Sequence, residues 1–174
     1  MGKIAEQGML TKTYTSVALS HEQKSAQRVL STLMARLQEA KRGAAQATDK
    51  AGAWHEFIAA DRYYQERALE RHVIPAIRDS IAEANALLRD LEALAASSAR
   101  ILHGMHEQWQ AGGPQADHAV LCAMEQYCHH LRERLRKEES ELIPLAFRAL
   151  TPEEWFAIAV KCFPEDGAAG RQAA

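Results

Sequence analysis

The chain has 174 residues, of which 47% are hydrophobic and 25% charged, values typical of one globular domain with a self-sufficient core. The formal net charge of -2 gives no general attraction to nucleic acid or to an anionic membrane. No apolar run approaches the roughly 20 residues that a membrane span requires. The three cysteines are an odd number without CxxC spacing, which favours a reducing, cytoplasmic compartment. We therefore expect a cytoplasmic protein with neither a nucleic-acid partner nor a membrane anchor.

The first two helical patterns fill the first half of the chain. The first runs from about residue 20 to residue 41, with Ser20 as its N-cap and Gln23 as the capping-box partner. A loop with the sequence "RGAAQATDKAG" follows it. The second pattern begins near Trp54, and Pro75 is expected to kink or end it, because proline cannot donate the backbone hydrogen bond of a helix interior.

Two further long patterns and a short one fill the second half. The third continues from about Ile81 to the loop "QAGGPQAD". Asp117 is expected to cap the fourth, which carries apolar residues at steps of three and four. The segment "LTPEEW" predicts a fifth helix with Thr151 as N-cap and Pro152 at the first helical position.

Long amphipathic helices with short connections, and no strand-like alternation, predict an all-α fold. We expect an up-down-up-down four-helix bundle with a short fifth C-terminal helix. The expected division of the chain is an N-terminal extension at 1–19, the bundle domain at 20–163 and a flexible tail at 164–174.

Polar residues interrupt the inward stripe of the fourth helix. Arg134 and Glu138 are four residues apart in the middle of it, so their side chains can meet on one helix face. Gln65 falls on the stripe of the second helix, and Gln23 on that of the first. Such residues either lie at a bundle end and extend to solvent, or form a buried cluster in which each charge needs a partner.

Three stretches resemble the hemerythrin-like, or HHE cation-binding, family. They are "ERALERHVIPAIRD", "RLRKEESELIPLAF" and "RALTPEEWFAIAVKCF", and "LLRDLEALAAS" is a weaker match to the family's third helix. The resemblance covers about residues 20–163. It implies a bundle whose helices supply histidine and carboxylate ligands to a non-haem di-iron centre that binds or senses oxygen or related species.

The positions of those ligands in this sequence are largely occupied by residues that cannot bind iron well. They correspond to Gln23, Gln65, Leu69, Ala95, Ala99, Arg134 and Glu138. Glu138 alone is a usual ligand type. Leucine and alanine have no donor atom, arginine is always positively charged, and glutamine is a weak oxygen ligand for iron.

The leading hypothesis is therefore a bundle that has lost its di-iron site and carries no cofactor. Arg134 would occupy the former metal cavity and neutralise Glu138 with bidentate hydrogen bonds, while Gln23 and Gln65 would satisfy the remaining polar atoms. The protein would act as a non-catalytic binding or regulatory module, with a second copy of itself or another protein as partner.

Two alternatives stay open. In the first, a reduced or relocated iron site around Glu66, Glu70, His106 and Glu138 binds or senses oxygen or nitric oxide. In the second, the small residues Ala95, Ser98 and Ala99 leave room in the core for haem or another small ligand.

Overall fold

The structure, a computed structural model, describes residues 2–42, 47–111 and 116–162. Its elements in chain order are α1 (Gly2–Lys41), α2 (Ala47–Glu66), the π-helical turn η1 (Leu69–Val73), α3 (Ile74–Ser80), the short 3-10 turn η2 (Ala82–Ala84), α4 (Asn85–Ala111), α5 (Ala116–Lys137), a second π-helical turn η3 (Glu138–Leu142), α6 (Ile143–Ala149) and α7 (Pro152–Cys162). The predicted tail, 164–174, and parts of both predicted loops lie outside the described residues.

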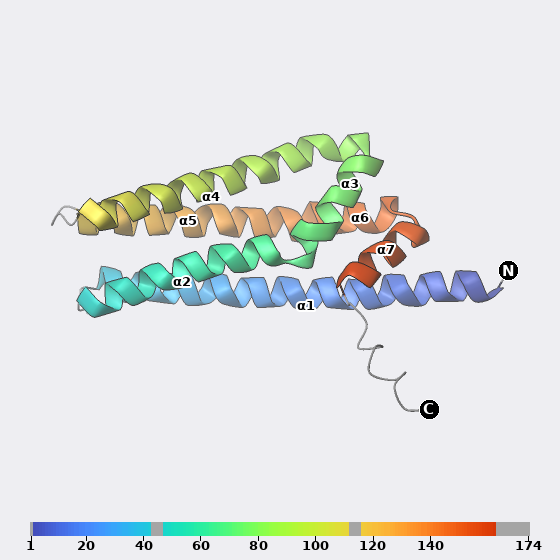
Figure 1. The fold of residues 1–174 in the computed structure, drawn as a ribbon, viewed down its shortest axis with the longest axis horizontal. Coiled ribbons are helices and arrows are strands. Elements are labelled where there is room, and N and C mark those ends of the chain that lie inside the picture. Colours follow the sequence, from blue (N-terminus) through green and yellow to red (C-terminus); the bar gives the residue numbers. More distant parts are fainter. Residues whose placement is uncertain (1, 43–46, 112–115, 163–174) are drawn as a thin grey trace, which may run out of the picture.

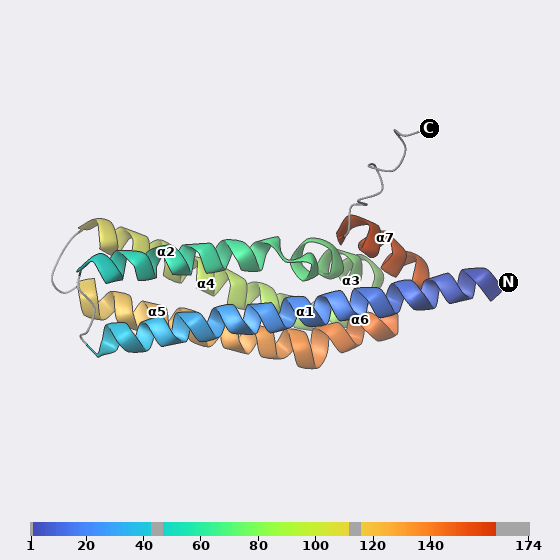
Figure 2. The same cartoon turned by 90° about the horizontal axis from the view of Figure 1, so that it is seen from below.

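The long helices alternate in direction, as Figure 1 shows, so the predicted all-α, up-down-up-down bundle is confirmed. Helix α5 contacts both α1 and α4, and α1 also contacts α2. The view from below shows α1 and α5 side by side, with the N-terminal part of α1 extending past the other long helices (Figure 2). Helix α7 packs along this part of α1.

The first helix begins much earlier than predicted. It starts at Gly2, so Ser20 lies within the helix and is not an N-cap, and Gln23 is not a capping-box partner. The helix continues because residues before position 20 also have packing partners: Thr15 and Leu19 are buried. The Lys12 ammonium donates a hydrogen bond of 2.7 Å to the carbonyl of Phe147. Whether 1–19 is a separate extension of the domain stays a prediction.

The two Ile-Pro sequences each follow a π-helical turn. The N–H of Ile74 donates to the carbonyl of Leu69, and the N–H of Ile143 donates to that of Glu138, five residues back in each case. Proline next in the chain cannot donate and crowds the carbonyl four residues before it, and a wider turn relieves that conflict. Pro75 thus distorts the helix, but the interruption after α2 lies eight residues earlier, at Arg67.

The predicted N-cap of the fourth helix is wrong, whereas that of the fifth helix is confirmed. Helix α5 begins at Ala116, which places Asp117 inside the first turn instead of at the cap. The predicted N-cap of α7, Thr151, is confirmed, and it forms a capping box with Glu154. The N–H of Glu154 donates to Thr151 Oγ1 at 3.2 Å, and the N–H of Thr151 donates to Glu154 Oε2 at 2.7 Å.

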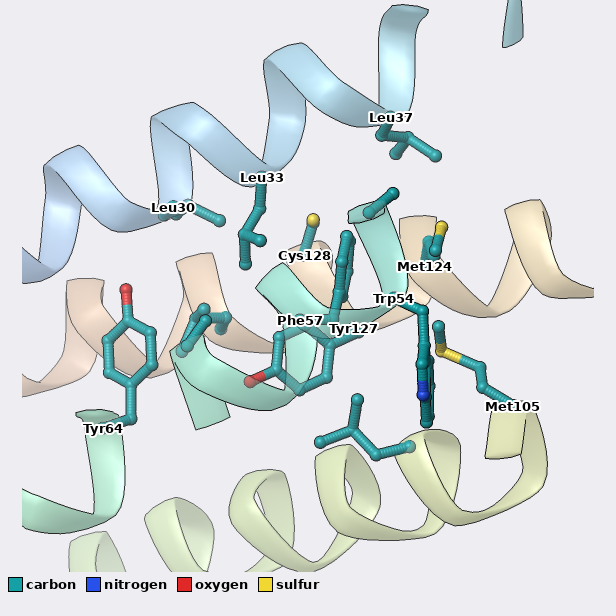
Figure 3. Close-up of a cluster of buried hydrophobic side chains, with 14 of the residues drawn as sticks. Leu30, Leu33, Leu37, Trp54, Phe57, Tyr64, Met105, Met124, Tyr127 and Cys128 are labelled. Atoms are coloured by element: carbon teal, nitrogen blue, oxygen red, sulfur yellow. The ribbon is translucent and has the colours of Figure 1, made fainter. Parts of the chain in front are cut away.

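Two apolar clusters form the core, one toward each end of the bundle. The first joins α1, α2, α4 and α5 and includes Leu33, Trp54, Phe57, Met105 and Tyr127 (Figure 3). The second is formed by Leu19, η1, α3, the start of α4, η3, α6 and α7, and includes Leu69, Leu88, Leu142 and Trp155. On α1, on the α2–η1 segment and on α5–η3, the residues between the two clusters are polar and buried.

None of the described helices is long and apolar enough to cross a membrane.

The rotation of α5 in the bundle can be tested through its two cysteines. Cys128 is buried among the residues of the first cluster, and burial raises the pKa of its thiol to about 11, whereas Cys122 is exposed. In native protein at pH 8, we expect a thiol reagent to label Cys122 quickly. Cys128 should react at least about 100-fold more slowly, because little of its thiol is ionised to thiolate. Peptide mapping by mass spectrometry measures both rates, and unfolding in urea should equalise them. Fast labelling of Cys128 in native protein would contradict this packing.

Candidate functional site

A polar layer crosses the bundle between its two apolar clusters. We define it by five side chains: Gln23 from α1, Arg67 from the interruption after α2, Glu70 from η1, Arg134 from α5 and Glu138 from η3. Gln23, Arg67 and Glu138 are buried, and each lies between residues of the two apolar clusters on its own segment. Hydrogen bonds join Glu70 and Arg134 to them at the same height. The layer is therefore a built feature of the core.

Arg67 and Glu138 form the centre of the polar layer. Both side chains are 0% exposed. Arg67 Nη1 donates to Glu138 Oε2 at 2.9 Å, and Arg67 Nη2 donates to Glu138 Oε1 at 2.8 Å. This is the bidentate geometry in which a guanidinium and a carboxylate bind most strongly.

Gln23 completes the hydrogen bonds of this pair. Its Oε1 accepts from Arg67 Nη1 at 2.9 Å, and its Nε2 donates to Glu138 Oε2 at 3.3 Å and to the carbonyl of Leu135 at 3.4 Å. The glutamine thus offers an acceptor to the cation and a donor to the anion. The prediction that Gln23 satisfies core polar atoms is confirmed.

Arg134 and Glu70 form the outer half of the layer. Arg134 Nε donates to Glu138 Oε1 at 3.1 Å, so the predicted contact forms, but as a single hydrogen bond, because Arg67 takes the bidentate position that was expected for Arg134. Arg134 Nη2 donates to Glu70 Oε1, and Arg67 Nη2 reaches the same oxygen at 3.4 Å. The side chains of Arg134 and Glu70 keep 12% and 18% exposure, so this half is close to solvent.

The interruption of the helix at Arg67 places its side chain in the layer. The carbonyl of Tyr64 accepts from Arg67 Nε at 3.3 Å. The N–H groups of Ala68 and Leu69 donate to the Glu22 carboxylate at 2.6 and 3.1 Å. Glu22 therefore does from α1 what an N-cap does from within a chain segment, since it accepts from N–H groups at the start of a helical turn.

Burial and opposite charges shift the pKa values of Arg67 and Glu70 in opposing directions. Burial alone would lower the pKa of Arg67, but the Glu138 carboxylate overcomes this and the net shift is upward. Arg67 thus stays protonated. Burial raises the pKa of the Glu70 carboxyl above its ordinary value, and the positive charge of Arg134 opposes that shift.

Four of the seven positions that the resemblance assigns to metal ligands lie outside the polar layer. Gln65 is exposed and donates to Asp61 Oδ2 at 2.7 Å, so its predicted place in the core cluster is wrong. Leu69 is buried in the second apolar cluster. Ala95 is half-buried and Ala99 is exposed. The break at Arg67 explains the error at Gln65, because counting back from Pro75 at helical spacing assumes an uninterrupted helix.

The relocated iron site is not assembled either. Glu70 and Glu138 meet through the two arginines, but Glu66 is exposed and lies 3.9 Å from Arg71. His106 is exposed and stacks on Trp54, with ring centroids 5.8 Å apart. Because Trp54 precedes Arg67 by 13 residues, roughly 20 Å along a helix, His106 lies far from the two carboxylates. Among the described residues, no three histidine, cysteine, aspartate or glutamate side chains gather as a metal site would need.

Arg67 and Glu70 are the residues that sequence reasoning missed. A signal for Arg67 existed: the buried positions Phe57, Ala60 and Tyr64 of α2 advance by three and four, and the next step reaches position 67. Glu70 was assigned to a metal site instead of an ion pair. Its true role depends on η1, whose wide turn alters which residues face inward.

Comparison with known proteins gives no match: no protein-family model, no curated protein and no solved structure is significantly similar to this chain. The hemerythrin-like resemblance therefore stays a prediction from its sequence motifs.

The central pair can be tested with a double-mutant cycle. We expect Arg67→Met and Glu138→Leu each to lower the free energy of unfolding by about 3–5 kcal/mol, because each leaves an uncompensated buried charge. The double variant should lose much less than the sum of the two, since Arg134 and Glu70 still balance each other. Urea unfolding measures all three variants.

Arg136→Met is the matched control, because Arg136 pairs with Glu133 at the exposed surface, and we expect little change. Additive effects of the two core substitutions would contradict the coupling.

Asp61 gives a prediction on pH. Burial raises the pKa of its carboxyl above the ordinary value, and the hydrogen bond from Tyr127 Oη, at 3.3 Å, opposes this. A carboxyl with a raised folded-state pKa favours folding when protonated. We therefore expect the wild type to lose stability relative to Asp61→Asn as the pH rises from about 3.8 through the folded pKa, and no further change above it. A difference that grows in the opposite direction would show that the hydrogen bond outweighs burial.

Proposed function

We propose that this chain is a metal-free bundle of the hemerythrin type that acts by binding, as a regulatory module without catalytic activity. The sequence motifs carry the family part of this proposal. The polar layer supports the metal-free part. A second copy of the chain or another protein is the proposed partner.

The supporting observation is the state of Glu138, the one former ligand position that keeps a usual ligand type. Both of its carboxylate oxygens accept hydrogen bonds from Arg67, and Oε1 also accepts from Arg134. An iron ion would have to displace two permanent positive charges from the same oxygens. The donor set present here therefore does not fit a di-iron centre.

The other carboxylate in the layer does not change this conclusion. Glu70 Oε1 accepts from both Arg67 and Arg134. Two guanidinium groups thus balance two carboxylates, and the layer has no net negative charge of its own to attract a cation. The arginines supply the positive charge that metal would supply in a cation-binding relative.

Elemental analysis tests the proposal directly. Protein expressed with iron supplied, and purified without chelator, should contain far less than one iron per chain, because the arginines already neutralise the available carboxylates. Iron at two ions per chain would contradict the proposal.

The Arg134→Ala variant distinguishes a metal site that has been lost from one that Arg134 merely blocks. If Arg134 only covered a competent site, this variant would gain iron. We expect it to be less stable than the wild type and still free of iron, because Arg67 remains on both oxygens of Glu138. Arg136→Ala, at the exposed surface of the same helix, is the control for an effect of the substitution itself.

A further inference from the structure

A cavity opens beside the outer half of the polar layer, between α3, α4 and α5. Its volume is about 200 Å³. Ile74, Leu88, Leu91 and Ala95 form apolar walls, and Glu70 and Arg134 form a polar wall. The exposed pair Arg78 and Glu92 borders the same cavity on its solvent side.

The polar wall still has hydrogen-bonding capacity. Within the described residues, Arg134 donates through Nε and Nη2, and no bond is made by Nη1. Glu70 accepts through Oε1 alone, which leaves Oε2 without a partner there. Both side chains line the cavity, so this donor and this acceptor are available to a molecule that binds there.

The charge balance of the layer selects the kind of molecule. Arg67 and Arg134 already match Glu70 and Glu138, so a bound carboxylate or ammonium would add an unbalanced charge near the buried pair. A neutral group with an acceptor oxygen next to an N–H donor adds none. A carboxamide has this arrangement: its oxygen can accept from Arg134 Nη1 while its nitrogen donates to Glu70 Oε2.

The size and walls of the cavity limit the remainder of the molecule. A water molecule takes up about 30 Å³ of liquid, so the cavity holds roughly six or seven non-hydrogen atoms. The leucine and isoleucine side chains of the walls favour a short hydrocarbon group next to the polar end.

We propose that this cavity is a binding site for a small neutral carboxamide with a short apolar tail, held by Arg134 and Glu70. The inference deepens the proposed binding function, because it names the class of ligand that the polar layer would recognise.

Isobutyramide is the probe for the test, with isobutyrate and isobutylammonium as its charged counterparts. Titrations of the full chain followed by ¹H–¹⁵N NMR should show saturable shifts with isobutyramide at residues of α3, α4 and α5. We expect each charged counterpart to bind at least about tenfold more weakly. Ala95→Leu should weaken isobutyramide binding at least about tenfold, because the added atoms fill the cavity.

Ala99→Leu is the matched control: it lies one turn along the same helix, is exposed and does not border the cavity, so binding should be unchanged. Ala95→Val gives the same test if the leucine variant does not fold. No binding of isobutyramide up to its solubility limit, tighter binding of either charged compound, or undiminished binding by the Ala95 variants would each overturn the inference. None of these results bears on the iron content, which tests the metal-free proposal separately.

Discussion

The structure depends on one buried ion pair, Arg67 with Glu138. Neither side chain reaches solvent, so each charge is tolerable only because the other is present. The pair connects the interruption after α2 with the start of η3, and it does so between the two apolar clusters. Sliding either segment by one residue would bury a charge against leucine. We expect the pair to favour one relative register of the helices, even though an apolar pair of similar volume could give equal or greater stability.

The backbone around the pair is shaped by two related distortions. Pro75 and Pro144 each follow a π-helical turn, and the turns begin at Leu69 and Glu138. Leu69 and Glu138 thus occupy equivalent positions in the two segments, and only the second is acidic. The acidic one needs a cation, and the break at Arg67 supplies it from the opposite segment. Glu22 compensates for the break by accepting the N–H groups that it releases.

The sequence allowed the bundle, its alternating topology and the N-cap of α7 to be predicted, because each rests on local periodicity or turn chemistry. The contact of Arg134 with Glu138 was predictable for the same reason, since four residues span one helical turn. The start of α1 was not, because it depends on packing against α7. The place of Gln65 was not, because helical counting fails across the break at Arg67. The central pair was missed for that reason too, although the stripe of α2 contained a signal for it.

The geometry also explains why the proposed loss of metal binding would be hard to reverse. Replacing Arg134 by histidine would add one suitable ligand type, but Arg67 would still occupy both oxygens of Glu138. Gln65 and Ala99 are exposed, so ligands introduced there would not face that carboxylate. Removing Arg67 as well would leave two carboxylates in the core before any metal arrived, and each single step would cost stability. As long as Arg67 pairs with Glu138 in this way, a single substitution elsewhere in the layer does not free both carboxylate oxygens for a metal.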